Sequence, residues 1–132
     1  MYIGENWLMA NPNVINVASI YGKTVFDADI ATSASAIVTN AASSGKVLKI
    51  NSLIIANIDG TNAADITASI TNAAGNTTSS YIAHTVSVPA DATLVVISKD
   101  TSIYLEEDMA IFLTASAAGD LSGTCSYDEI SE

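Results

Sequence analysis

Arginine is missing from this chain of 132 residues, and its positive charges are few. Four lysines stand against 14 aspartates and glutamates, which gives a formal net charge of -10 at pH 7. Without arginine there is no planar guanidinium for bidentate recognition of phosphate or guanine, and so acidic a chain repels a phosphate backbone. The composition therefore argues against direct binding of nucleic acid. It also opposes association, except through surfaces that are locally neutral.

Cysteine and histidine each occur once, as Cys125 and His84. A single cysteine allows no internal disulfide, and its parity with Leu121 and Tyr127 predicts a small buried side chain on one face of a strand. His84 shares its parity with apolar residues such as Val86, which predicts a hydrogen-bonded packing residue rather than a catalyst. No second histidine exists to complete a metal pair.

Long hydrophobic runs are also lacking, although 49% of the residues are hydrophobic and only 14% are charged. No run approaches the ~20 residues that cross a bilayer, so no membrane segment is expected. The opening "MYIGENWLMA" has no basic residue and does not resemble a secretory signal. We expect one folded, soluble domain that buries roughly two-thirds of its unfolded surface.

What the chain does have is alternation of apolar and polar side chains with a period of two, whereas the period of a helix is almost absent. The segments 64–71 and 109–117 alternate regularly. The segment 46–58 becomes apolar on both sides from Leu53 to Ala56, which predicts a central strand whose second face is covered. The fold class expected is all-β: a single β-sandwich, jelly-roll or immunoglobulin-like, with about nine antiparallel strands.

Turn signals such as "NAASSGK" and "NIDGTNAAD" separate the expected strands. Strands are expected at residues 14–20, 23–30, 35–39, 46–58, 64–71, 79–88, 93–98, 102–105 with 109–117, and 121–130. Residues 1–13 are expected to form an extended N-terminal arm, and residues 14–132 the sandwich domain.

Three adjacent carboxylates, Glu106, Glu107 and Asp108, are the nearest approach to a chemical motif. A hairpin-like bend between two apolar stretches is where water best screens like charges. Acid–base catalysis would need a partner such as a paired histidine or a nucleophile elbow, and none is recognisable. We therefore expect a solvated turn, with no catalytic residue, no metal and no cofactor. Calcium binding, here or in the loop with Asp59 and Asp65, stays open as an alternative.

The stretches "KVLKINSLIIANIDGTNAADITASI", "HTVSVPADATLVVISKDTSIYLEEDM" and "LTASAAGDLSGTCSYDEIS" carry a family resemblance. Their order of strands and turns resembles a family of small virion structural proteins of tailed bacteriophages, such as those of marine cyanophages, over residues 9–131. The family usually has glycine in the acidic turn, where this chain has Glu106, Glu107, Asp108 and Met109. Without a glycine at positive φ, a different turn type is expected.

The resemblance implies a non-enzymatic structural component of the virion, a repeated exterior subunit that decorates or cements the capsid. A place at the neck, tail or fibre is an alternative. So is a carbohydrate-binding adhesion module, for which Tyr81 and Tyr104 are the candidate outward aromatics. The implied partners are other copies of the chain and other virion proteins, such as major capsid, tail or neck proteins, assembled in the cytoplasm of the host bacterium.

The first eight residues hold the only tryptophan and have no pattern that would bury it in the sandwich. Apolar side chains left exposed on so acidic a chain are a liability, whereas an inserted tryptophan is a strong interface anchor. We therefore expect Tyr2, Ile3, Trp7 and Leu8 to contact a neighbouring subunit, with Pro12 stiffening the exit of the arm. A frayed terminus is the plainer alternative.

Overall fold

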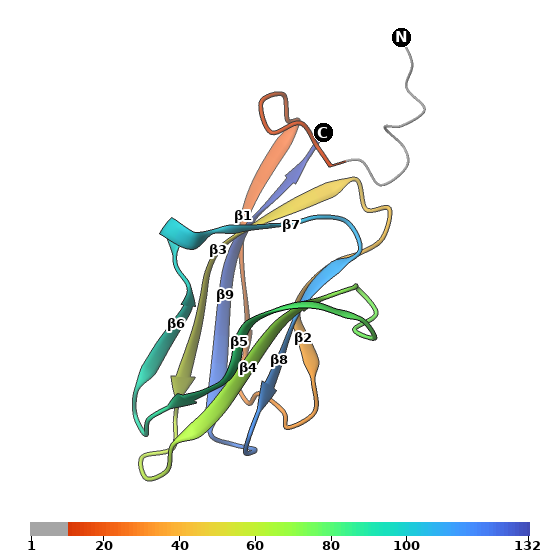
Figure 1. Ribbon diagram of the computed structural model, residues 1–132. Coiled ribbons are helices and arrows are strands. Elements are labelled where there is room, and N and C mark those ends of the chain that lie inside the picture. Colours follow the sequence, from red (N-terminus) through yellow and green to blue (C-terminus); the bar gives the residue numbers. More distant parts are fainter. Residues whose placement is uncertain (1–10) are drawn as a thin grey trace.

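The computed structural model describes residues 11–132 and shows two antiparallel sheets packed face to face (Figure 1). The strands are β1 (Ser19–Asp27), β2 (Ser35–Asn40), β3 (Lys46–Asn57), β4 (Ala64–Thr71), β5 (Thr78–Val88), β6 (Thr93–Ile97), β7 (Ile103–Leu105), β8 (Met109–Ala115) and β9 (Leu121–Ser131), with a 3-10 turn η2 (Lys99–Thr101) before β7. The expected all-β sandwich is confirmed. Residues 11–132 contain no helix long and apolar enough to span a membrane.

The strand order identifies the type of sandwich. Sheet A has the order β1-β9-β3-β6, with β7 pairing the first part of β3, and sheet B has the order β2-β8-β4-β5. The pairs are nested, because β4 pairs β5, β3 pairs β6, β2 pairs β8 and β1 pairs β9. Such a rolled antiparallel ribbon, with successive pairs in opposite sheets, is a jelly roll. Of the two expected types, the jelly roll is therefore the one observed.

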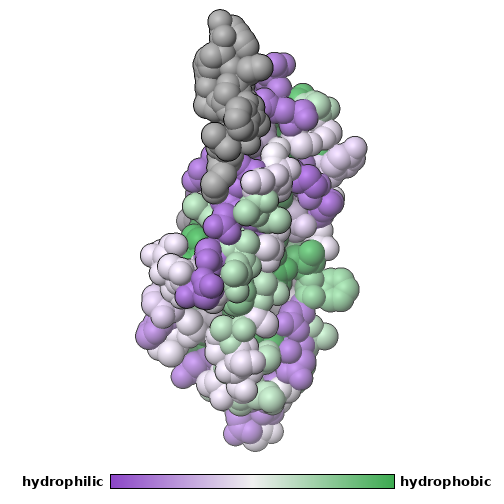
Figure 2. Space-filling view, turned by 90° about the vertical axis from the view of Figure 1, so that its right-hand side faces the viewer, coloured by the Kyte–Doolittle hydropathy of each residue, from purple (hydrophilic) through white to green (hydrophobic). Residues whose placement is uncertain are grey.

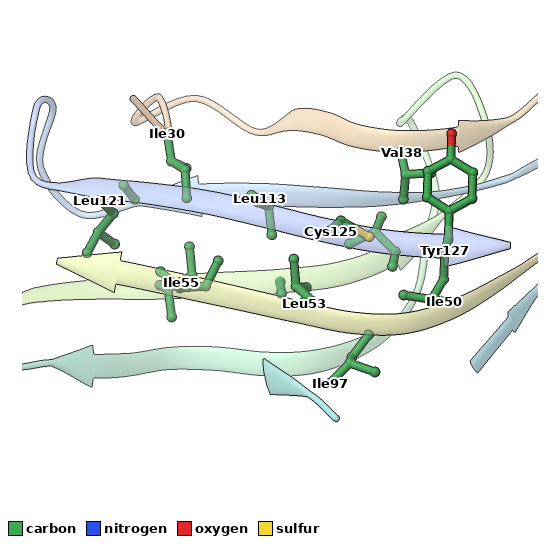
Figure 3. Close-up of a cluster of buried hydrophobic side chains, with 14 of the residues drawn as sticks. Ile30, Val38, Ile50, Leu53, Ile55, Ile97, Leu113, Leu121, Cys125 and Tyr127 are labelled. Atoms are coloured by element: carbon green, nitrogen blue, oxygen red, sulfur yellow. The ribbon is translucent and has the colours of Figure 1, made fainter. Parts of the chain in front are cut away.

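The core lies between the sheets and takes alternate residues from each strand (Figure 3). Leu53 of β3 and Leu113 of β8 are both fully buried, one from each sheet. Gly123 of β9 faces the same space, and a Cβ added there would lie 3.2 Å from Leu113 Cδ1 and 3.3 Å from Ile30 Cδ1. The core is packed so closely at this point that only glycine fits without displacing its neighbours.

Most expected strands are confirmed, since β2, β3, β4, β5, β6 and β9 begin and end within a single residue of their expected bounds. The separate strands expected at 14–20 and 23–30 are wrong. One continuous strand, β1, runs through Gly22, and it pairs β9 without a register shift. Residues 14–15 form a turn before β1. Gly22 resembles a turn glycine in the sequence, but its pairing with Asp128 places it inside a ladder.

The expected continuity of 102–105 with 109–117 is also wrong, because β7 lies in sheet A and β8 in sheet B. The acidic residues between them form a crossover from one sheet to the other. The alternation on both sides of the crossover is regular, so the local pattern resembles one bent strand. The change of sheet depends on which distant strand each half pairs with, β3 for β7 and β4 with β2 for β8.

Candidate functional site

The outer face of sheet A carries a row of side chains that crosses four strands. Phe26 of β1 lies opposite Thr124 of β9, Thr124 opposite Ile54 of β3, and Ile54 opposite Val95 of β6. Their neighbours along the strands, such as Leu53, face the core, so the row points away from it. Phe26 is 77% exposed and Val95 is 55% exposed. The row therefore places large apolar side chains on an open sheet surface.

Small and hydroxyl side chains flank this row on both sides. One flanking row pairs β1, β9 and β3, and the other pairs β9, β3 and β6. Together with the central row they form what we name the Phe26 face, which consists of Thr24, Phe26, Ser52, Ile54, Ala56, Thr93, Val95, Ser122, Thr124 and Ser126. None of these residues is charged, on a chain with a net charge of -10. Figure 2 shows hydrophobic residues exposed at the surface among hydrophilic ones.

The sequence predicted a covered second face for the segment from Leu53 to Ala56. The central position of β3 is confirmed, since it lies between β9 and β6. The cover is not found, because sheet B packs on the opposite side and no strand of residues 11–132 lies over Ile54. The apolar run in β3 was thus a usable signal for this face. The exposure of Phe26 had no such signal, since it depends on pairing with β9.

The acidic turn binds other segments of the chain. Glu106 Oε1 accepts a hydrogen bond from Asn11 Nδ2 at 2.6 Å, and Asp108 Oδ1 accepts one from the backbone N–H of Ala73 at 3.2 Å. Asp108 has a φ of 60°, the left-handed conformation that aspartate tolerates better than most residues. Asp108 therefore supplies, without a glycine, the positive φ that was not expected in this turn. The hairpin-like bend expected here is wrong, because the turn connects two sheets.

The predicted solvated turn is wrong at Glu107, because this residue is only 6% exposed. Its Oε2 accepts a hydrogen bond from the backbone N–H of Gly45 at 2.7 Å, and Gly45 has a φ of 70°. Its Oε1 is buried without a hydrogen-bond partner among the described residues. The crossover folds over the turn between β2 and β3, and this contact removes the carboxylate from water.

In the second acidic loop, the carboxylate of Asp59 accepts hydrogen bonds from within the loop. Asp59 Oδ1 accepts a hydrogen bond from the N–H of Thr61 at 2.8 Å, and Asp59 Oδ2 accepts one from Asn62 Nδ2 at 3.1 Å. These bonds lower the pKa of Asp59 below its ordinary value, against the opposing effect of burial. The backbone N–H of Asp65 donates to Ser116 Oγ. Across residues 11–132, no three His, Cys, Asp or Glu side chains gather to hold a metal ion.

His84 is exposed, so the predicted packing role on an apolar face is wrong. The reason is a bulge in β5: the register with β4 shifts between Ile66 and Ala68, and Thr85 has a φ of 48°. A bulge interrupts the alternation on which the prediction rested. The His84 ring instead meets the Tyr81 ring edge to face, with centroids 4.6 Å apart.

Cys125 is fully buried, as predicted, and on the same face of β9 Leu121 is fully buried and Tyr127 is 8% exposed. Burial raises the pKa of the Cys125 thiol to about 12. The thiolate is the nucleophilic form, so at neutral pH this cysteine is chemically inert.

Tyr81 and Tyr104 point outward as expected, with 55% and 49% of their surface exposed. They lie on β5 in sheet B and on β7 in sheet A. Because they belong to different sheets, they do not form one aromatic platform. The most exposed aromatic side chain within residues 11–132 is Phe26.

The predicted anchors Tyr2, Ile3, Trp7 and Leu8 lie outside the described residues, so the arm stays a prediction. The described chain begins beside sheet A, where Pro12 is buried and the N–H of Ala18 donates to the carbonyl of Ser131 at 2.9 Å. A groove of about 360 Å³ lies there, lined by Asn11, Pro12, Val14, Val47, Tyr104 and Glu106.

Comparison with known proteins adds no family to these observations. No protein-family model matches the chain, and no curated protein matches it in sequence.

Proposed function

We propose that this protein is a non-enzymatic structural subunit of a tailed-bacteriophage virion, repeated on the exterior of the particle, where it decorates or cements the capsid. The observation that carries the proposal is the Phe26 face, an uncharged and partly apolar surface on a chain of net charge -10. Exposed apolar patches mark contact surfaces, and association of so acidic a protein needs a locally neutral one. The resemblance of residues 9–131 to small virion proteins points to a virion as the assembly.

The side chains that were candidates for chemistry have structural contacts, and this supports a structural role for the protein. Glu107 holds the β2–β3 turn through the N–H of Gly45, and Cys125 is core packing. The jelly roll agrees with the proposal without assigning it, because viral capsid and lectin domains share this architecture and a fold alone does not imply a function.

The N-terminal arm is the second contact in this proposal. Of the arm predicted at residues 1–13, the part before Asn11 reaches a neighbouring subunit or the underlying shell, with Tyr2, Ile3, Trp7 and Leu8 as apolar anchors. Deleting residues 1–8, or changing Trp7→Ala, should leave the melting temperature of the monomer unchanged and weaken attachment to particles. Tyr81→Ala is the matched control, since it removes an exposed aromatic ring from sheet B. Full attachment of the deletion variant, or unfolding of its sandwich, would show that the arm lacks this role.

Particles purified from the phage that carries this gene test the function itself. Mass spectrometry should find the chain at a copy number comparable with that of the major capsid protein, and electron cryomicroscopy should place jelly-roll density outside the head. Density at the neck, tail or fibre would select the alternative location. Absence of the chain from the particle would refute the proposal.

A carbohydrate-binding adhesion module is the second candidate, and one observation favours it. Phe26 is a 77% exposed ring beside the hydroxyl side chains of Thr24 and Thr124 on a sheet face. A ring can stack on a sugar while hydroxyl groups hydrogen-bond to it. Binding of the wild-type chain to a glycan array, lost in Phe26→Ser, would favour this candidate. No glycan binding by either protein would leave the subunit contact as the better reading of the face.

A further inference from the structure

We infer that the Phe26 face is a homotypic interface, on which a second copy of this chain packs sheet against sheet with β1 of one copy over β6 of the other. The inference rests on the proposed function in one respect, since it names the partner of the same face. Its geometry comes from the face alone. Two sheets that pack in this way lie about 10 Å apart, with their strands within about 30° of each other.

The net charge of the chain favours a second copy as the partner that covers the Phe26 face. Each copy has a net charge of -10, so contact between two copies costs least where both surfaces are uncharged. The Phe26 face meets this condition, and pairing it with itself sets neutral surface against neutral surface. A basic partner would gain more from the acidic surface elsewhere on the chain. A neutral apolar face therefore suits a partner that carries the same charge.

The shape of the row selects the orientation. Phe26 stands at one end on β1, Val95 stands at the other end on β6, and Thr124 and Ile54 lie between them. A twofold axis along the strands, passing between β9 and β3, sets Phe26 of one copy over Val95 of the other. It also sets Thr124 over Ile54. Each contact then pairs a larger with a smaller side chain, and each occurs twice, as in any isologous interface.

The other twofold orientation fits less well. An axis along the row would set Phe26 on Phe26 and Val95 on Val95. Two phenylalanines at one edge and two valines at the other would hold the sheets farther apart at β1 than at β6. Voids of this kind lose dispersion contacts. The orientation with β1 over β6 keeps the two sheets evenly spaced.

The size of the face sets the expected strength. Four strands about 4.8 Å apart and three rows about 6.8 Å apart cover roughly 400 Å² in each copy. A standard stable interface buries about 800 Å² per partner, so the isolated pair should be weak, with a dissociation constant on the order of 100 μM to 1 mM. A weak contact becomes firm when many copies are held on one particle, because neighbours raise the effective concentration.

Cysteine cross-linking tests the orientation. Phe26→Cys and Val95→Cys are prepared as two separate proteins, and Cys125 adds little background because it is buried. With a short bismaleimide that joins two thiols across the sheet spacing of about 10 Å, the mixture should form a cross-linked dimer, whereas neither protein alone should. The double variant should stop at a dimer with two intermolecular cross-links. Its two cysteines lie about 14 Å apart across three strand spacings within one copy, farther than two cysteines that face each other across the interface.

The matched control lies on the opposite sheet. Thr39 of β2 and Tyr81 of β5 are exposed on the two edge strands of sheet B, so Thr39→Cys mixed with Tyr81→Cys measures random collision. The Phe26→Cys and Val95→Cys mixture should react at least roughly tenfold faster. Sedimentation velocity complements this test: the wild-type chain should associate near its expected dissociation constant, and Phe26→Ser should not, although its melting temperature is unchanged.

Each outcome decides the inference. A dimer specific to the mixture, together with loss of association in Phe26→Ser, supports it. A wild-type chain that stays monomeric at about 1 mM overturns it, since the interface area predicts measurable association there. Faster linking of Phe26→Cys to itself overturns the orientation, and association that appears only after deletion of residues 1–10 means that the chain covers its own face. If the chain is found in virions but the cysteine variants do not cross-link, the homotypic interface is refuted and the proposed function stands. If the variants cross-link but the chain is absent from virions, the proposed function is refuted and the interface stands.

Discussion

The two phenylalanines of the chain lie on the two outer faces of the sandwich, and their surroundings differ. Phe112 of β8 is half-buried, because residues 72–77 fold back over sheet B and place Gly75 against its ring. Phe26 of β1 is 77% exposed. The chain thus builds a cover for one apolar face from its own β4–β5 connection. The other face has no such cover within residues 11–132, so its apolar side chains stay open to solvent.

The cover on sheet B depends on three features that act together. Gly75 has a φ of 77°, which residues with a Cβ adopt only with strain. The N–H of Ala73 donates to Asp108 Oδ1, and the N–H of Asn72 donates to the carbonyl of Thr77. The acidic crossover is therefore part of the cover as well as the link between the sheets.

Removing this cover should give the largest effect. In Gly75→Ala the new Cβ overlaps the Phe112 ring and the backbone is strained, so the free energy of unfolding should fall by about 3 kcal/mol. Gly119→Ala is the matched control, because Gly119 has a φ of 83° and nothing lies within 4 Å of its added Cβ. It should lose only about 1 kcal/mol. Urea denaturation measures both, and equal losses would mean that the ring contact is unimportant.

Replacing each of the two phenylalanines by serine tests whether the chain covers Phe112 and leaves Phe26 open. Phe112→Ser should lower the free energy of unfolding by about 2 kcal/mol, since it removes a ring that the chain has covered. Phe26→Ser should change it by less than about 0.5 kcal/mol, because the side chain is already in water. Thermal unfolding of dilute protein provides the measurement. A large loss in Phe26→Ser would show that this face is covered within the monomer.

Glu107 should give an intermediate effect. Glu107→Ala removes the acceptor of the Gly45 N–H and should lower the free energy of unfolding by about 1 to 2 kcal/mol. Glu107→Gln keeps an acceptor oxygen and should retain most of that stability. Chemical denaturation of the two variants separates hydrogen bonding from charge. If glutamine proves as damaging as alanine, the negative charge itself is required, and the hydrogen-bond account fails.

Glu129 of β9 should give the smallest effect, which is present at neutral pH and lost in acid. Burial raises the pKa of Glu129, but hydrogen bonds from Lys23 at 3.1 Å and Lys46 at 3.3 Å outweigh it, so the pKa lies below 4.5. A lowered pKa in the folded state adds stability above the unfolded pKa, and this is lost as the pH falls through the folded pKa. The melting temperature of wild type should therefore exceed that of Glu129→Gln at neutral pH, by a margin that shrinks as the pH falls below the unfolded value of 4.5 and is lost through the folded pKa. A margin independent of pH would contradict this.

The local sequence pattern predicted those features of the strands that depend on which side chains are buried. The bounds and alternation of β3 and β4 follow from which side chains must leave water, and the jelly roll was one of two expected types. The exposure of Phe26 could not be predicted, because it depends on the pairing of β1 with β9 across 112 residues, as between Ser19 and Ser131. A bulge at Thr85 displaced His84, and a change of sheet buried Glu107. Both are consequences of pairing, which the period of one strand does not reveal.

The nested ribbon also has a kinetic consequence. β4 and β5 are joined by a short turn and can pair at once, whereas β1 must wait for β9, its hydrogen-bonding neighbour in sheet A. Closing so long a loop is entropically unfavourable, so sheet A should form late and slowly. Because β9 pairs both β1 and β3, a chain cut before residue 121 loses the centre of that sheet and not just its border. Truncated chains should therefore aggregate rather than persist as a smaller sandwich, because two strands expose unpaired backbone.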